Sequence, residues 1–192
     1  MAVRIGILAL QGAVREHADA FARLRVETVA LKTPAQLEDV DALVLPGGES
    51  TTMSMLLEKS ELFDPVAKLL DDGMPALGTC AGMILLATEV FDGRADQRNF
   101  GAIDIGVRRN AWGRQVDSFE AALHVGAFGA DPFPAVFIRA PRVERVGDDV
   151  EVLAAIDDEP VLCRSGSILV SSFHPELSGD LRIHQLFLEG VR

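Results

Sequence analysis

The chain has 192 residues, of which 48% are hydrophobic and 24% charged, and its formal net charge is −11. These values predict a single folded domain over residues 1–192 and exclude a disordered chain. The acidic balance argues against nucleic acid as the main partner, because phosphate binding needs a basic surface, and no apolar run is long enough to span a membrane.

Strand-like and helix-like segments alternate along the first half. Continuous apolar runs predict strands over residues 3–10, 26–31, 41–45 and 75–79. Apolar residues at helical spacing predict helices around Val14, Ala18, Phe21 and Leu24, around Met53, Leu56 and Leu57, around Val66, Leu69 and Leu70, and over residues 81–88. This alternation predicts βαβ units and therefore an α/β fold with a mostly parallel, doubly wound sheet and helices on both faces.

The second half is rich in short strands. Strand-like runs cover residues 102–108, 119–128, 135–139, 150–156, 161–164 and 167–172, with turn residues between them. They predict antiparallel additions to the sheet. Ile183, Leu186 and Phe187 then predict a closing helix. The chain contains no linker or internal repeat, which agrees with a single domain.

The stretch GTCAG, residues 78–82, joins the strand that ends at Thr79 to the next helix. Its G-x-C-x-G pattern is the cysteine counterpart of a nucleophile elbow, a sharp turn that lifts a side chain above the sheet and needs small neighbours. The elbow also places Cys80 at a helix N-terminus, where the dipole favours the thiolate. The alternative is a small apolar cysteine buried at a strand end. That alternative is favoured for Cys163, which lacks small flanking residues.

A cysteine nucleophile needs a base and a group that orients the base. His174 and Glu176 lie in SSFHPE at the end of a predicted strand, and residues two apart in extended chain point to the same side. The pair therefore predicts an imidazole held by a carboxylate, although a surface turn around Pro175 would give the same pattern. The other histidines are interpreted as structural or, for the first, as solvated or packed against a helix: His17, His124 and His184.

The stretch LPGGEST, residues 45–51, follows another strand and contains two glycines. Ser50 or Thr51 is expected to cap the following helix. In a doubly wound sheet this loop and the Cys80 elbow share one edge, so N–H groups of the loop and of Ala81 can converge on an oxyanion. A simple strand-to-helix turn is the alternative.

The sequence lacks the common metal and nucleotide motifs. There is no CxxC pair, no HExxH and no GxxxxGK[ST] loop. We therefore expect neither a metal nor a cofactor. Two cysteines give little basis for disulfides, and the apolar start is more typical of a strand than of a signal peptide, which predicts a reducing, cytoplasmic location.

Taken together, these stretches resemble the triad-type (class I) glutamine amidotransferases, and among them the glutaminase subunits of pyridoxal 5′-phosphate synthases. The resemblance rests on LALQGAVREH (8–17), LPGGESTTM (45–53), GTCAGMILLA (78–87), RRNAWGRQVDSFEA (108–121), VFIRAP (136–141) and SFHPEL (172–177). It implies hydrolysis of L-glutamine to glutamate and ammonia through a γ-glutamyl thioester. It also implies delivery of the ammonia to a (β/α)8-barrel synthase partner.

The resemblance further implies residue roles. Cys80 corresponds to the nucleophile, His174 to the general base and acid, and Glu176 to the group that orients it. The backbone of Gly48 and Ala81 corresponds to the oxyanion hole, and Gln11 to the partner interface. The positions that match glutamine-binding residues are Gly48, Glu49, Ser50, Arg109, Ile138 and Arg139. Which arginine meets the α-carboxylate stays open.

Two rival functions remain. One is another cysteine amidase or peptidase on the same fold, and the other is a non-catalytic binding or regulatory module. The QGAVREH and GRQVDSFE stretches argue against the first rival, and the intact Cys80, His174 and Glu176 argue against the second.

Overall fold

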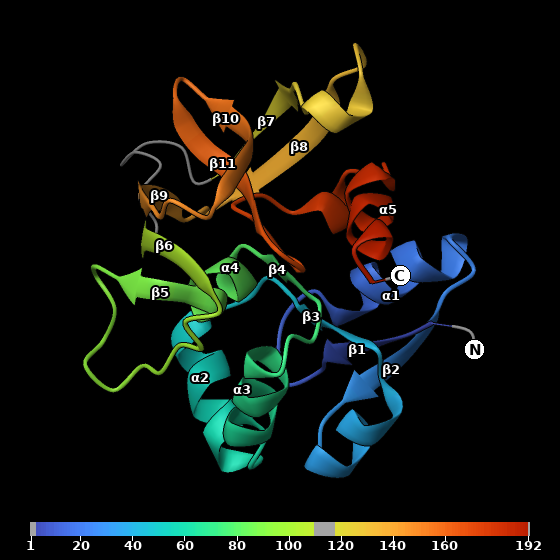
Figure 1. The fold of residues 1–192 in the computed structure, drawn as a ribbon, viewed down its shortest axis with the longest axis vertical. Coiled ribbons are helices and arrows are strands. Elements are labelled where there is room, and N and C mark those ends of the chain that lie inside the picture. The colour runs from blue at the N-terminus through green and yellow to red at the C-terminus, as the bar shows by residue number, and fades with distance from the viewer. Residues whose placement is uncertain (1–2, 110–117, 192) are drawn as a thin grey trace.

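The computed structural model describes residues 3–109 and 118–191 and is built on a seven-stranded sheet (Figure 1). Its strand order is β10-β11-β12-β4-β3-β1-β2. The bounds are Arg4–Leu8 (β1), Glu27–Leu31 (β2), Ala42–Leu45 (β3), Ala76–Thr79 (β4), Glu151–Ile156 (β10), Glu159–Ser165 (β11) and Ile168–Ser171 (β12). Strands β2, β1, β3, β4 and β12 are parallel, and β11 and β10 continue the sheet antiparallel. The predicted fold class is confirmed.

Helices cover both faces of this sheet. Their bounds are Val14–Arg23 (α1), Ser50–Lys59 (α2), Phe63–Asp71 (α3), Ala81–Leu86 (α4) and Arg182–Glu189 (α5), with 3-10 segments at Pro34–Asp39 (η1), Gly126–Phe128 (η2) and Pro175–Leu177 (η3). α1 and α5 lie together on one face, and α2, α3 and α4 lie on the other (Figure 1). No helix among the described residues is long and apolar enough to cross a bilayer.

The two faces have separate cores, which explains the apolar runs of the central strands. β3 and β4 are buried at every position because helices cover them on both sides. Phe21 of α1 and Phe187 of α5 pack in one core with alternate residues of β1, such as Ile5. Met53 of α2 packs in the other core with Leu8.

Two small sheets extend the domain. One contains β5 (Ala87–Val90), β6 (Ile103–Arg108) and β9 (Arg142–Val146), and the other contains β7 (Ser118–Leu123) and β8 (Phe133–Ile138). Two sequence expectations were wrong here: the helix expected to reach residue 88 ends at Leu86, and the strand expected to reach residue 128 ends at Leu123. Strands β5 and β9 were not predicted. In the first case Ala87 pairs with Ile103. That non-local pairing overrides the local helical pattern.

The connectivity brings four loops to one edge. β1, β3, β4 and β12 run parallel, so the loops after Leu8, Leu45, Thr79 and Ser171 all leave from the same side of the sheet. The strand order reverses at β1, which has β2 on one side and β3 on the other. Ligand crevices in doubly wound sheets form at such a point, outside the carboxyl ends of the strands.

Candidate active site

A cavity of about 390 Å³ opens at this edge. It is lined by Gln11, Gly47, Gly48, Glu49, Ser50, Cys80, Ile84, Arg109, Ile138, Arg139 and His174. The structure thus brings the six positions expected to bind substrate into one cavity with Cys80 and His174. Gly47 and Ile84 also line it and had not been singled out. Glu176 lies behind His174, outside the cavity lining.

Cys80 occupies the turn between β4 and α4. Its backbone adopts φ 50° and ψ −104°, a region that non-glycine residues rarely occupy. The Cys80 N–H donates to Ser171 O at 2.8 Å, and the thiol lies 3.7 Å from Ile138 O. The backbone is therefore held in a strained conformation at the sheet edge, as in a nucleophile elbow.

The glycines beside Cys80 allow this tight turn. A Cβ on Gly82 would overlap the carbonyl oxygen of Leu45 on β3, and a Cβ on Gly78 would approach the Gly82 backbone to 2.8 Å. Helix α4 therefore sits directly on the strands beneath it. Ala81, the first residue of α4, is buried and supplies one of the N–H groups that a first helical turn leaves without an intrahelical partner.

His174 and Glu176 lie side by side, although by a different local structure from the one expected. The chain is not extended: His174 precedes the 3-10 turn η3. The Nδ1 atom of His174 lies 2.7 Å from Oε1 of Glu176. The backbone N–H of His174 donates to Val136 O on β8 at 2.8 Å, which links the histidine to the two-stranded sheet of β7 and β8. The 3-10 turn and the hydrogen bond to Val136 together hold the His174 and Glu176 side chains next to each other.

The electrostatics favour a protonated His174. Burial alone would lower the pKa of His174, but hydrogen bonds to Cys80 and Glu176 outweigh burial and raise it to about 10. Burial would likewise raise the pKa of Glu176, yet the neighbouring His17 and His174 lower it. An imidazolium held between a sulfur and a carboxylate can pass a proton to a leaving group.

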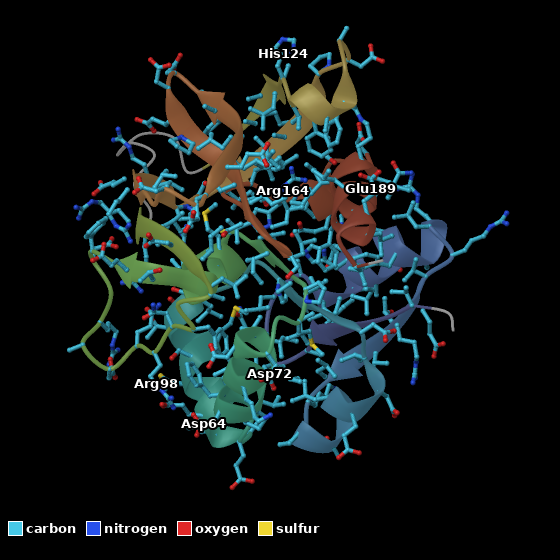
Figure 2. All side chains as sticks on the ribbon, viewed as in Figure 1. Asp64, Asp72, Arg98, His124, Arg164 and Glu189 are labelled. Carbon is cyan, nitrogen blue, oxygen red and sulfur yellow. The ribbon has the colours of Figure 1, made fainter. Side chains whose placement is uncertain are left out.

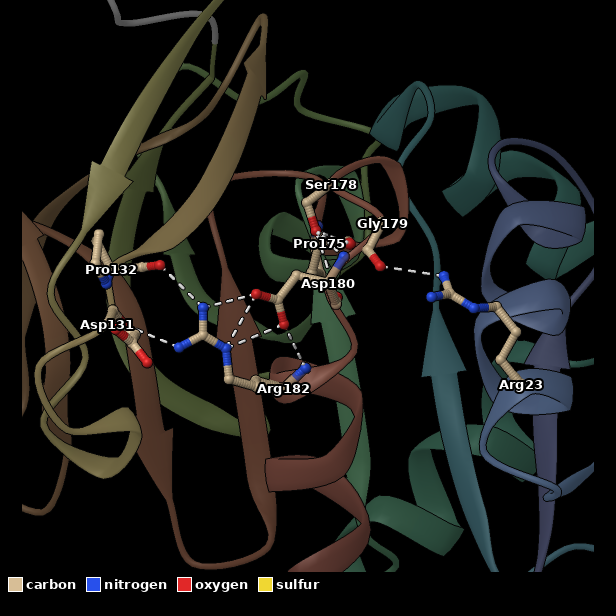
Figure 3. A network of polar contacts seen from close by, with 8 residues as sticks. All are labelled: Arg23, Asp131, Pro132, Pro175, Ser178, Gly179, Asp180 and Arg182. Atoms are coloured by element: carbon tan, nitrogen blue, oxygen red, sulfur yellow. Dashed lines mark hydrogen bonds and ion pairs between the residues drawn. The ribbon is translucent and has the colours of Figure 1, made fainter.

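Charged contacts fix the segment that follows Glu176 (Figure 3). The Arg182 guanidinium donates to the carboxylate of Asp180 and to the carbonyl oxygens of Asp131 and Pro132, at 2.9 Å each for the carbonyls. Arg23 of α1 donates to Gly179 O at 3.1 Å. The segment is thus fastened to α1 and to the loop before β8. This restrains the turn that carries the carboxylate.

The glycine loop packs on the catalytic histidine candidate and on the first loop. A Cβ on Gly47 would overlap the His174 ring. Gly47 O accepts from Ala13 N at 3.0 Å, and the Gln11 side-chain oxygen accepts from Glu49 N at 2.9 Å. Two hydrogen bonds therefore link the loop after β1 to the loop after β3.

The cap of α2 differs from the expected one. Ser50 and Thr51 are helical, and Glu49 is the N-cap, accepting from Thr51 N at 3.2 Å and Thr52 N at 2.7 Å. Burial would raise the pKa of Glu49, but hydrogen bonds from Thr52 and Thr51 lower it. Its carboxylate therefore faces the helix N-terminus as an anion, which stabilises the helix dipole.

Two arginines reach the cavity from the small sheets. Arg109 follows β6, and its guanidinium donates to Thr51 Oγ1 at 2.7 Å and lies 3.8 Å from the Glu49 carboxylate. Arg139 follows β8, is exposed, and has a φ of 44°. Ile138 beside it is 39% exposed. The additions to the core fold thus supply one wall of the cavity.

The remaining cysteine and histidines fall into two groups. Cys163 is fully buried in β11, and burial raises its pKa to about 12. His124 lies in the exposed loop after β7, not in the expected strand, and Figure 2 shows it at the edge of the molecule. His17 and His184 are fully buried. The solvated alternative considered for His17 is therefore wrong.

One resemblance motif is only partly visible. The stretch RRNAWGRQVDSFEA covers residues 108–121, and residues 110–117 lie outside the described part of the chain. Of its candidate site residues, Arg109 is described.

Comparisons with known proteins agree with this geometry. The model of the SNO glutamine amidotransferase family matches residues 7–192. A protein of Mycobacteroides abscessus, named pyridoxal 5′-phosphate synthase subunit PdxT, is 56% identical over 193 residues and covers 100% of this chain and 99% of its own length. A protein of the same name from Rhodococcus opacus is 53% identical over 195 residues, covering 98% and 96%. A crystal structure of a glutamine amidotransferase superposes with a TM-score of 0.91 at 47% identity, covering 97% and 98%.

Proposed function

The chain belongs to the SNO glutamine amidotransferase family, and from this premise we propose that it is the glutaminase subunit of a pyridoxal 5′-phosphate synthase. It hydrolyses L-glutamine to L-glutamate and ammonia. The observation that carries the proposal is the single cavity in which Cys80, His174 and the glycine loop meet, with Glu176 bonded behind the histidine.

The first half of the reaction forms a thioester. The Cys80 thiolate attacks the side-chain amide carbon of glutamine, and the amide oxygen becomes an oxyanion that accepts hydrogen bonds from the backbone N–H groups of Gly48 and Ala81. The His174 imidazolium gives its proton to the leaving nitrogen, and the C–N bond breaks to release ammonia. The raised pKa of His174 keeps that proton available at neutral pH.

The second half returns the enzyme to its starting state. Neutral His174 takes a proton from a water molecule, and the hydroxide adds to the γ-glutamyl thioester. The C–S bond then breaks, and glutamate leaves with the Cys80 thiolate restored. Glu176 keeps the His174 ring oriented through both halves, because its carboxylate accepts from Nδ1 and leaves Nε2 to face the sulfur.

The α-carboxylate end of glutamine faces the wall of the cavity that contains Arg109 and Arg139. The α-carboxylate is an anion, and Arg109 and Arg139 are the two arginines that line the cavity among the described residues. Loss of the arginine that binds the carboxylate should raise KM for glutamine more than it lowers kcat. The larger rise in KM between Arg109→Ala and Arg139→Ala therefore identifies that arginine.

The relatives are named as subunits of a synthase, which supports a synthase partner that consumes the ammonia. By resemblance this partner is a (β/α)8-barrel subunit that builds pyridoxal 5′-phosphate from a pentose phosphate and a triose phosphate. The side chain of Gln11, which lines the cavity, is assigned to the partner interface. Both cysteines are free thiols, which supports a reducing, cytoplasmic location.

The test is glutamate release from L-glutamine by the purified chain, measured with and without the synthase subunit. Cys80→Ala is the control for contaminating activity. Release that needs intact Cys80 is the expected result. Absence of release under both conditions would refute the proposal. Cleavage of peptides instead would identify a cysteine peptidase, and glutamine binding without turnover would identify a regulatory module.

A further inference from the structure

A buried polar cluster lies behind the triad, on the side away from the cavity. The Glu176 side chain is fully buried, and its Oε1 atom is bonded to His174. Its second oxygen, Oε2, lies 3.4 Å from Nε2 of His17 on α1, and among the described residues it has no aligned hydrogen bond. An anionic oxygen buried in this way requires a donor, because an uncompensated buried charge is costly.

His17 has two further polar neighbours. Its Nε2 lies 3.2 Å from Thr79 Oγ1, the residue before Cys80, and its Nδ1 lies 3.1 Å from Nε2 of His184 on α5. Burial lowers the pKa of His17, and it lowers that of His184 to about 3. Both rings are therefore neutral at physiological pH, and each carries one proton.

The neighbours decide which nitrogen of His17 carries that proton. With the proton on Nε2, the N–H points at Thr79 Oγ1, 3.2 Å away, and lies beside Glu176 Oε2, which is 3.4 Å from Nε2, while Nδ1 accepts from the Nε2–H of His184. With the proton on Nδ1, the lone pair of Nε2 would face the Glu176 carboxylate and repel it. The Nε2–H form is therefore favoured.

We infer that His17 is a positioning residue for the glutaminase reaction: its Nε2–H holds the second oxygen of Glu176, and His184 holds His17 in the required tautomer. The inference rests on the proposed function. It extends the chain of contacts from Cys80 and His174 through Glu176 into the packing between α1 and α5. His17 does not line the cavity, so it acts through Glu176 and not on the substrate.

Loss of this donor has a defined electrostatic consequence. The groups that face Glu176 are His174 on its own segment, His17 on α1 and, more weakly, His184 on α5. Glu176 also lines a second cavity of about 140 Å³. The charged residues that share this lining are Glu16, Asp19, Arg23 and Asp180. The Nε2–H of neutral His17 places the positive end of a dipole beside Oε2, 3.4 Å from Nε2, and so stabilises the anionic form of Glu176; removal of this N–H therefore raises the pKa of Glu176. Glu176 then takes up a proton at a higher pH and releases His174.

Two amide substitutions separate this role from simple packing. In His17→Gln the amide nitrogen reaches the place of Nε2 and can still donate to Glu176. In His17→Asn the shorter amide reaches only the place of Nδ1 and keeps the contact with His184. Both variants are measured in the complex with the synthase subunit, across pH, with active sites counted by covalent labelling of Cys80.

His17→Asn should lower kcat by about ten- to a hundredfold with little change in KM, as expected when a buried charge loses its donor. The acid limb of its pH profile should move to higher pH. His17→Gln should stay within about threefold of wild type, as expected when a hydrogen bond is kept, with an unmoved acid limb. If the two variants behave alike, or if His17→Asn keeps the wild-type acid limb, the inference is wrong.

A wild-type complex that releases no glutamate would instead refute the proposed function, so the two failures are distinguishable. Should His17→Asn not fold, His184→Asn poses the same question one contact further away. It removes the donor to His17 Nδ1 and predicts a smaller shift of the acid limb in the same direction. An unshifted limb in that variant overturns the inference.

Discussion

The two cysteines of this chain are both buried, but only Cys80 lines the cavity. Cys80 lines the cavity at the end of β4, whereas Cys163 is sealed in β11 with a pKa raised to about 12 by burial. A thiol is a poor nucleophile until it loses its proton. Reactivity toward glutamine should therefore belong to Cys80 alone.

An electrophilic glutamine analogue should label Cys80 and leave Cys163 unmodified. Cys80→Ala should lose activity on the order of 10⁴-fold or more, because removal of a nucleophile removes the covalent route. Mass spectrometry of the labelled protein locates the adduct. Cys163→Ala is the matched control and should label normally; an adduct on Cys163 would contradict the assignment.

Removal of the Glu176 charge should move the alkaline limb of the activity profile. In the wild type, activity should fall as pH rises through about 10, where His174 loses the proton that ammonia needs. Glu176 raises that pKa, so Glu176→Gln should shift the limb to lower pH. It should also reduce kcat less than His174→Ala, for which a loss on the order of 10²–10⁴ is expected. Kinetics of both variants across pH provide the check. Wild-type behaviour in both would mean that residues 174–176 form a structural turn with no catalytic role.

At the scale of the elements, the site depends on how closely α4 approaches the sheet. The glycines at 78 and 82 permit backbone contact between α4, β4 and β3, and β3 is buried throughout. This contact fixes the position of the strained turn at Cys80. Any side chain at residue 82 must push the helix away from Leu45.

Gly82→Ala should therefore destabilise the protein by about 1–3 kcal/mol or more, because the added methyl meets backbone that cannot rotate aside. For a chain of this size the melting temperature should fall by about 3–10 °C. Gly126→Ala is the control, since a Cβ there meets nothing within 4 Å and the residue has no positive φ. Equal thermal stability of the two variants would show that α4 is not tightly seated.

At the scale of the whole molecule, the segment 11–17 contacts two separate parts of the candidate active site, the glycine loop and Glu176. Gln11 bonds the loop that carries Gly48, and His17 lies against Glu176. If the proposed synthase partner binds this segment, it contacts residues that touch both the glycine loop and Glu176. The two glycines of that loop make a backbone change sterically easy.

We expect low glutaminase activity from the isolated chain and a rise when the synthase subunit is added. Gln11→Ala should reduce that stimulation by about fivefold, the value of one hydrogen bond, and leave labelling of Cys80 intact. Gln185→Ala, on the exposed face of α5, is the matched control. Full activity in the isolated chain, unchanged by the partner, would refute the coupling and leave the glutaminase assignment in place.

Local pattern was sufficient to determine the alternation of elements, the class of sheet and the motifs at the strand ends, because periodicity and small-residue spacing are properties of neighbouring residues. The α/β class and the strands of the parallel core were predicted in this way, and GTCAG and SFHPE marked the cavity. Contacts between distant segments decided the rest. The pairing of Ala87 with Ile103 ended α4 early, and the tether of His174 to Val136 aimed the histidine through a 3-10 turn. The burial of His17 against Glu176 and His184 joins residues far apart in the chain, and such packing leaves no local signal because burial depends on which helices meet across a sheet.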